Sequence, residues 1–185
     1  KYIKIYRASD GKTFKPIGIQ QPSISGYSDF SPEGKASYRI TYIDQNYRES
    51  GFSNIASASK RNMTDEELLD MVQQSHFRYY WEGAEPNSGL ALENIPGRSS
   101  MIATGASGFG IMAIISAAKR EFITRDQAVE RFIKITDFLL KADRFHGVFP
   151  HFLDGQTGKV VPFFGKRDNG GDLVETSFLM QGLLT

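Results

Sequence analysis

The sequence contains no cysteine among its 185 residues. This absence excludes disulfide bonds within the chain and catalysis by a thiolate. The sequence also lacks a run of about 20 consecutive apolar residues, the length that a membrane-spanning helix requires. Basic residues are not gathered on one segment, and the formal net charge is only +1. We therefore expect neither a membrane span nor the positive surface that binds a nucleic-acid backbone.

Signals for a metal or a cofactor are also missing. The three histidines, at positions 76, 146 and 151, do not have the H-E-x-x-H spacing of a zinc site. Residues 104–110 read TGASGFG, but a phosphate-binding loop needs a preceding strand and a following Lys-Ser/Thr pair. The pattern predicts no strand before this segment, and the pair is absent. We expect no cofactor, and we interpret the small residues as allowing two helices to approach closely.

What the sequence does contain is sufficient for a folded core. Hydrophobic residues make up 40% of the chain and aromatic residues 12%, a composition typical of globular proteins. The first residues, KYIKIYRAS, already alternate as in a strand, and the last, DLVETSFLMQGLLT, stop within a helical pattern. We therefore expect the chain to be a piece of a longer protein.

Residues 1–60 predict an antiparallel β module. Apolar and polar residues alternate in YIKIYR and SYRITYID, and the turn-forming segments SDGK, SPEGK and DQNYRESG separate the strands. Tyr38 and Ile40 share one face of the predicted strand, and Arg39 and Thr41 share the other, so one face should be buried. The module resembles the later strands of a fibronectin type III domain, without material for the first two strands. This pattern predicts a partial β-sandwich.

Residues 61–185 change to helical periodicity and form the second predicted domain. Capping boxes at Thr64 and Thr124, each with Glu or Gln three residues later, predict helices over 64–81 and 124–143. An apolar segment predicts another helix over 107–120, and a last helix should begin near Asp172. Between the helix over 124–143 and this last helix, the segment GVFPHFLDGQTGKVVPFFG should form a hairpin-like excursion that turns at DGQTG.

Three carboxylates gather in the segment KRDNGGDLVETSF, residues 166–178. If Asp172 is the N-cap of the last helix, Glu175 falls at N3, and the pair forms a capping box with no function implied. Against this structural interpretation, Glu175 shares the apolar stripe of its helix with Leu179. A carboxylate on a buried face needs partners, or its pKa rises towards values useful for proton transfer. Asp168 should be brought alongside by the two glycines that follow it.

Aromatic residues near this segment suggest a sugar ligand. Trp81 ends the first helix, while Phe163 and Phe164 lie on the hairpin that leads into the acidic loop. Aromatic faces beside carboxylates suit sugar rings, which have apolar C–H faces and hydroxyl edges. His151 is a candidate hydrogen-bond partner for a sugar. Core packing is the structural alternative for each of the three aromatic residues, and for His151 it is a structural histidine whose hydrogen bonds are satisfied within the protein.

Several motifs in order resemble one family of proteins. They are DEELLDMVQQSHFRYYWEGAEPNSGLALE, SSMIATGASGFGIMAI, GVFPHFLDGQTGK and DNGGDLVETSFLMQGLLT. Across residues 64–185 they resemble the bacterial glucoamylase-like family, which includes endo-β-1,2-glucanases. The resemblance implies the N-terminal part of an all-α (α/α)6 toroid, with inverting hydrolysis of a glucan. It places the family's acidic motif on Asp168, Asp172 and Glu175, and a further essential carboxylate on a later helix outside this chain.

The resemblance therefore implies a glycoside hydrolase acting on an oligo- or polysaccharide, with β-1,2-glucan favoured. Only a third of the ring is present, so we expect this chain alone to be inactive and its exposed helix faces to favour self-association. The resemblance also implies a periplasmic or cell-surface protein. The alternative is a non-catalytic carbohydrate-binding or scaffold protein. A polysaccharide lyase or a sugar epimerase is less compatible with an acidic motif.

Overall fold

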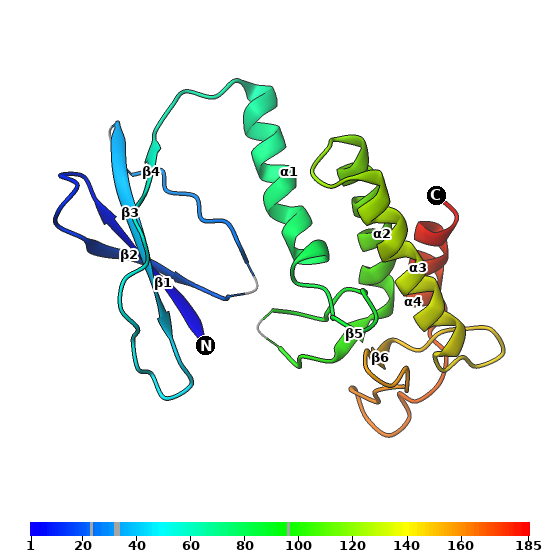
Figure 1. Ribbon diagram of the computed structural model, residues 1–185. Coiled ribbons are helices and arrows are strands. Elements are labelled where there is room, and N and C mark those ends of the chain that lie inside the picture. Colours follow the sequence, from blue (N-terminus) through cyan, green and yellow to red (C-terminus); the bar gives the residue numbers. More distant parts are fainter. Residues whose placement is uncertain (23, 32–33, 96) are drawn as a thin grey trace. The chain divides into compact units, whose positions relative to one another are not determined.

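The computed structural model describes residues 1–22, 24–31, 34–95 and 97–185. The chain divides into two compact units, Lys1–Asp70 and Met71–Thr185, which are described here one at a time (Figure 1). Strands dominate the first unit and helices the second. In the described part of the chain, no helix is both long enough and apolar enough to cross a membrane.

The first unit is built on a four-stranded sheet, as the alternating pattern predicted. All neighbouring strands are antiparallel, in the order β2-β1-β3-β4 (Figure 1). The strands are β1 (Tyr2–Ala8), β2 (Lys15–Gln20), β3 (Lys35–Ile43) and β4 (Ala56–Ser59). The two longest strands, β1 and β3, pair at the centre.

Strand β3 separates two faces, but burial does not follow the polarity of its side chains. Thr41 is only 4% exposed, and its hydroxyl donates to Glu49 Oε1 at 2.7 Å. On the same face, Phe52 packs against Tyr6 with ring centroids 4.9 Å apart. Ile40, on the opposite face, is 41% exposed and lines a groove of about 550 Å³. Near Thr41 the more polar face of this strand is therefore covered, while on the other face Ala36 is buried and Ile40 is exposed.

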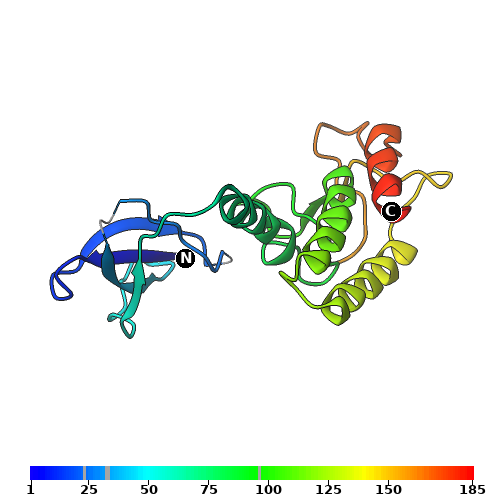
Figure 2. The ribbon, with the colours of Figure 1, turned by 90° about the horizontal axis from the view of Figure 1, so that it is seen from above.

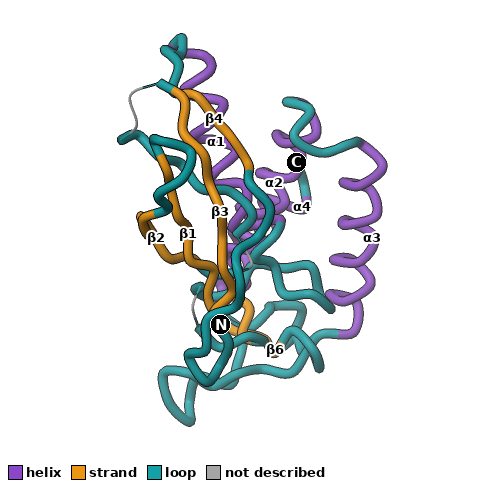
Figure 3. Tube along the Cα trace, turned by 60° about the vertical axis from the view of Figure 1, so that its left-hand side comes forward, coloured by secondary structure: helices purple, strands orange, loops and turns teal. Residues whose placement is uncertain are grey.

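The four predicted helices are confirmed, and long loops follow the first and the third of them (Figure 3). They are α1 (Asp65–Trp81), α2 (Thr104–Lys119), α3 (Arg125–Lys141) and α4 (Leu173–Leu183). Both predicted capping boxes are present. The Thr64 hydroxyl and the Glu67 carboxylate exchange bonds with each other's backbone amides, and Thr124 and Gln127 do the same.

A two-stranded sheet was not predicted. Strand β5 (Met101–Ala103) directly precedes α2 and pairs antiparallel with β6 (Phe152–Asp154). The expectation that no strand precedes residues 104–110 is therefore wrong. Each strand has only three residues and its partner lies about 50 positions away, too short and too distant for periodicity to show. The hairpin-like excursion is confirmed, because Val161 N–H donates to the Phe152 carbonyl at 3.0 Å.

Helices α2 and α4 cross at two glycines. A Cβ added to Gly108 would lie 2.1 Å from the carbonyl oxygen of Phe178, and one added to Gly182 would lie 2.3 Å from that of Gly108. Any side chain at either position would therefore collide with backbone. Leu179, beside the crossing, is fully buried. The predicted role of the small residues in 104–110 is confirmed, and Figures 1 and 2 show the two helices side by side.

Apolar side chains also remain on the outer faces of α3 and α4. The most exposed of them are Ile133, Leu140, Leu173 and Val174, and Leu184, directly after α4, is exposed as well. All lie away from the main core cluster of this unit, which includes Ile102, Ile114, Ile135, Leu153 and Leu179. These faces are the uncovered helix surfaces that the sequence predicted.

Candidate active site

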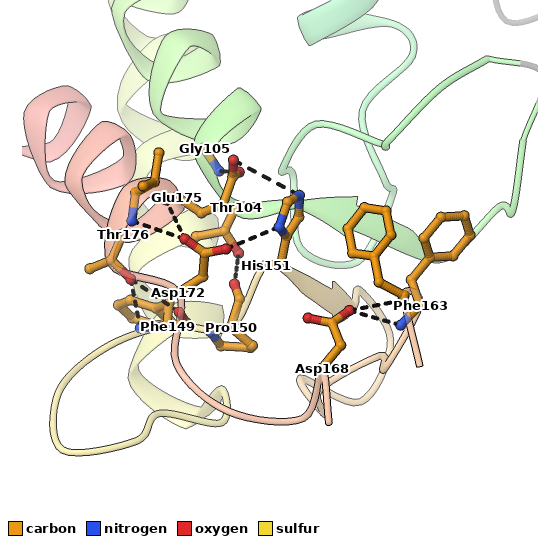
Figure 4. A network of polar contacts seen from close by, with 12 residues as sticks. Thr104, Gly105, Phe149, Pro150, His151, Phe163, Asp168, Asp172, Glu175 and Thr176 are labelled. Carbon is orange, nitrogen blue, oxygen red and sulfur yellow. Dashed lines mark hydrogen bonds and ion pairs between the residues drawn. The ribbon is translucent and has the colours of Figure 1, made fainter. Parts of the chain in front are cut away.

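The site lies at the mouth of α4, where two threonines fix the segment that carries His151 (Figure 4). The Thr176 hydroxyl accepts the N–H of Phe149 at 2.8 Å and donates to its carbonyl at 3.1 Å. From α2, the Thr104 hydroxyl donates to the Pro150 carbonyl at 2.7 Å, and Thr104 N–H donates to the His151 carbonyl at 3.1 Å. The backbone before His151 is therefore held from two helices at once.

Asp172 caps α4, as predicted. Its Oδ1 accepts the N–H groups of Val174 at 2.9 Å and Glu175 at 3.0 Å. Its Oδ2 lies 3.1 Å from His151 Nδ1. The hydrogen bond from the Glu175 amide is the main reason why the pKa of Asp172 lies below its usual value, although partial burial opposes the shift. The Asp172 carboxylate is therefore held in its ionised form.

Glu175 does not complete a capping box with Asp172, so that structural interpretation is wrong for this residue. The Asp172 N–H, which the box would use, donates instead to the Phe149 carbonyl at 2.8 Å. The Glu175 Oε2 accepts the N–H of Gly105 at 2.8 Å, in the first turn of α2. A helix N-terminus attracts negative charge. Glu175 Oε1 lies 3.9 Å from His151 Nε2, so one imidazole ring stands between two carboxylates.

Asp168 does not join these two carboxylates (Figure 4). Its Oδ2 accepts the backbone N–H groups of Phe163 and Phe164, each at 3.1 Å. Among the described residues, it forms no hydrogen bond with Asp172, Glu175 or the histidine between them. The expectation that the acidic loop places all three carboxylates alongside one another is therefore wrong, since Asp168 closes the loop on which the aromatic pair lies.

The two glycines after Asp168 have different surroundings. A Cβ on Gly171 would lie 2.8 Å from the Val148 side chain, whereas Gly170 faces open space. Gly171 therefore lets the loop pass close to the 145–148 turn. Where the structure is described, Lys166 and Arg167 form no ion pair with the acidic motif, whose carboxylates instead accept hydrogen bonds from backbone amides.

The two predicted phenylalanines lie beside His151. Phe164 is 67% exposed, and its ring centroid is 5.2 Å from that of His151. Phe163 is 45% exposed and packs edge-on against the buried Phe152 at 5.4 Å. The structure thus joins Phe164 to the carboxylates through the histidine, and Phe163 is linked to them only through its contacts with Phe164 and Phe152.

Trp81 lies elsewhere, at the end of α1. Its ring stacks on Phe77 at 5.7 Å, and the Arg131 guanidinium lies 4.2 Å from the centre of the same ring. Arg131 also donates to the Trp81 carbonyl at 3.2 Å. The structure gives Trp81 a packing environment at the edge of the core and does not bring it to His151.

No sequence motif indicated the groups that fix the site: Thr104, Gly105 and Thr176. Their partners lie 27 to 70 positions away along the chain, and no local pattern marks such bonds. Among the described residues, no group of three metal-ligating side chains is arranged to hold a metal ion.

Comparisons with known proteins place this geometry in context. No protein-family model matches the chain. Over its whole length it is 62% identical to an exo β-1,2-glucooligosaccharide sophorohydrolase (non-reducing end) from Parabacteroides distasonis, and it covers 26% of that protein. A solved β-1,2-glucanase from the same species is also 62% identical, with a TM-score of 0.92 over 100% of this chain and 27% of that chain.

A solved endo-β-1,2-glucanase from Chitinophaga pinensis, in complex with sophorotriose and glucose, is 48% identical. Its TM-score is 0.63, with 66% of this chain and 31% of that chain covered. The chain thus spans about a quarter of the length of the curated relative that it matches. The resemblance to endo-β-1,2-glucanases that the sequence motifs indicated is confirmed.

Proposed function

We propose that this chain is part of a glycoside hydrolase that cleaves β-1,2-linked glucans or gluco-oligosaccharides with inversion at the anomeric carbon. One observation carries the proposal. Asp172 and Glu175 flank the two ring nitrogens of His151 at a helix mouth, in a chain 62% identical along its whole length to a sophorohydrolase. The exposed Phe164 ring beside them supports a sugar ligand.

The geometry favours one chemical role for Asp172. Inverting hydrolysis needs a base that activates water and an acid that protonates the leaving oxygen, usually about 6.5 to 9.5 Å apart. The lowered pKa of Asp172 keeps its carboxylate able to accept a proton or a hydrogen bond, but makes it a poor donor. We therefore assign Asp172 to the water or to a sugar hydroxyl. The proton donor would be a carboxyl group of the longer protein.

The architecture that we propose for that longer protein follows from two features. The sheet order β2-β1-β3-β4, with one face of β3 lining an open groove, supports a partial fibronectin type III-like module over residues 1–60. Helices with exposed outer faces support the N-terminal part of an (α/α)6 toroid over residues 61–185. On this proposal the 185-residue chain alone is inactive, because most of the ring is missing.

The test uses the full-length protein, expressed at the length of its relatives, and measures release of products from β-1,2-glucan and from α-glucans. We expect hydrolysis of β-1,2-glucan only, with inversion visible by NMR of the first product. Asp172→Asn and Glu175→Gln should each reduce kcat by about 100-fold or more. Both substitutions keep an oxygen that can accept the existing backbone N–H bonds, so the loss would report the charged oxygen that faces His151.

Two controls complete this test. Glu130→Gln changes an exposed carboxylate on α3 and should leave turnover unchanged. Asp168→Asn completes the series of the predicted acidic motif. Undiminished turnover in all three motif variants would contradict the catalytic proposal. Binding of β-1,2-glucan without any product, measured by calorimetry, would instead support the carbohydrate-binding alternative.

A further inference from the structure

We infer that the ring of Phe164 is the stacking surface for a glucose ring next to the carboxylates, and that its neighbour Phe163 serves to hold it. This inference rests on the proposed function and adds a binding position to it. It distinguishes two adjacent phenylalanines that the sequence treats alike.

Phe163 already has partners on several sides. The guanidinium of Arg98 lies 5.5 Å from the centre of its ring, and Phe152 packs against it at 5.4 Å. The ring centroids of Phe163 and Phe164 are 5.1 Å apart. Cation–π and edge-to-face contacts of this kind stabilise a ring within the protein. Phe164 also contacts Phe152, at 5.8 Å, so exposure is what distinguishes the pair. Less than half of the Phe163 surface is exposed, and Phe163 is therefore the packing member.

Phe164 is the member that faces outward, with 67% of its surface exposed. Its position is nevertheless fixed. The Asp168 carboxylate accepts the backbone N–H of both phenylalanines, and Asp168 N–H donates to the Gly165 carbonyl at 2.9 Å. The 163–168 loop is thus closed on itself by three hydrogen bonds. An exposed aromatic ring on a fixed backbone is a preorganised binding surface, because little entropy is lost when a ligand contacts it.

The surroundings of Phe164 indicate a sugar more than a protein partner. His151, with its two carboxylates, lies beside the ring, and the Asp168 carboxylate holds the same loop. A sugar ring matches this mixture, because its C–H face can stack while its hydroxyl edge meets hydrogen-bonding groups. By contrast, Leu173 and Val174 are aliphatic residues, 76% and 62% exposed, and are suited to helix packing.

The test compares three variants of the full-length protein with β-1,2-glucooligosaccharides as substrates. Phe164→Ala should raise KM about five- to tenfold and change kcat by less than about twofold. Phe164→Tyr keeps the ring face and should restore KM to within about twofold of wild type. Phe163→Ala should lower Tm and change KM less than Phe164→Ala does. If Phe164→Ala does not fold, Phe164→Leu keeps apolar volume without a ring and should show the same rise in KM.

Two results would overturn the inference while leaving the proposed function intact. One is an unchanged KM in folded Phe164→Ala and Phe164→Leu. The other is a KM that rises as much in Phe164→Tyr as in Phe164→Ala, which would show that the ring face is not what binds. In both cases wild-type turnover persists. Failure of the proposed function would look different, because the wild-type protein itself would then release no product from these substrates.

Discussion

Carboxylates in the two units of this chain have partners of different kinds. In the β unit, the Glu49 carboxylate accepts hydrogen bonds from the hydroxyls of Tyr6 and Thr41, and its other oxygen accepts one from Lys4 at 3.1 Å. Every donor there is a side chain of the same sheet. In the helical unit, Asp172 and Glu175 take their bonds mainly from backbone amides and share one histidine.

On the proposed function, this difference separates a structural carboxylate from one available for chemistry. Glu49 ties the loop after β3 to the sheet with both of its oxygens, and the hydrogen bond from Tyr6 is the largest cause that lowers its pKa to about 2. The carboxylates around His151 are fixed through one oxygen each by the backbone, which leaves the other oxygen beside an imidazole ring. Carboxylates that are held in place through one oxygen, with the other oxygen not bonded to the backbone, are typical of a binding or catalytic site when they lie beside an exposed aromatic ring.

The largest expected effect comes from breaking the contact that builds the helical site. Gly108→Ala places a methyl group within 2.1 Å of a backbone oxygen of α4, so the helices must separate, at a cost of about 3 kcal/mol or more. Because Glu175 reaches Gly105 across this same crossing, activity should be lost together with stability. Thermal unfolding and turnover of the full-length variant measure both.

Gly51→Ala in the β unit is the matched control for this substitution. Its added methyl group meets nothing within 4 Å, and its φ lies outside the left-handed region. We expect a Tm close to that of wild type and unchanged turnover. A Gly108→Ala variant as stable as this control would contradict the close helix crossing.

A smaller effect should appear in the pH dependence of stability, through the carboxylate of the β unit. Because the pKa of Glu49 is lowered to about 2 in the folded sheet, its contribution to stability is full above its unfolded value, about 4.3, and is lost as pH falls towards 2. The gap in Tm between wild type and Glu49→Gln should therefore be wide at pH 6 and narrow at pH 3. Turnover at pH 6 should be the same in both proteins. A gap that does not change with pH would show that the charge of Glu49 contributes nothing.

Local features of the fold could be predicted from the sequence, and contacts between distant segments could not. The caps at Thr64, Thr124 and Asp172 depend on residues within three positions, so their spacing was sufficient. Strand β5 has three residues and is stabilised by pairing with β6, and no periodicity in the sequence indicates such a pairing. The burial of Thr41 under the loop that carries Glu49 is likewise a tertiary effect that overrides polarity.

The candidate site shows the same division. The sequence identified Asp172, Glu175 and His151, and the structure brings these three together. The position predicted for Asp168 was wrong. Its carboxylate could accept hydrogen bonds either from the helix that follows or from the loop that precedes it, and the path of the backbone decides between the two. Trp81 was selected as an aromatic residue at the end of the first helix, and its packing against Arg131 depends on a helix 50 positions later.

The central claim is that the carboxylates at the mouth of α4 and the Phe164 ring bind and cleave a β-1,2-linked glucan. The most direct measurement is a crystal structure of the full-length Asp172→Asn variant with a bound β-1,2-glucooligosaccharide. We predict one glucose ring stacked on Phe164 and a sugar oxygen within hydrogen-bond distance of Asn at position 172 or of Glu175. Sugar bound at a different place, with these side chains facing bulk solvent, would contradict the claim.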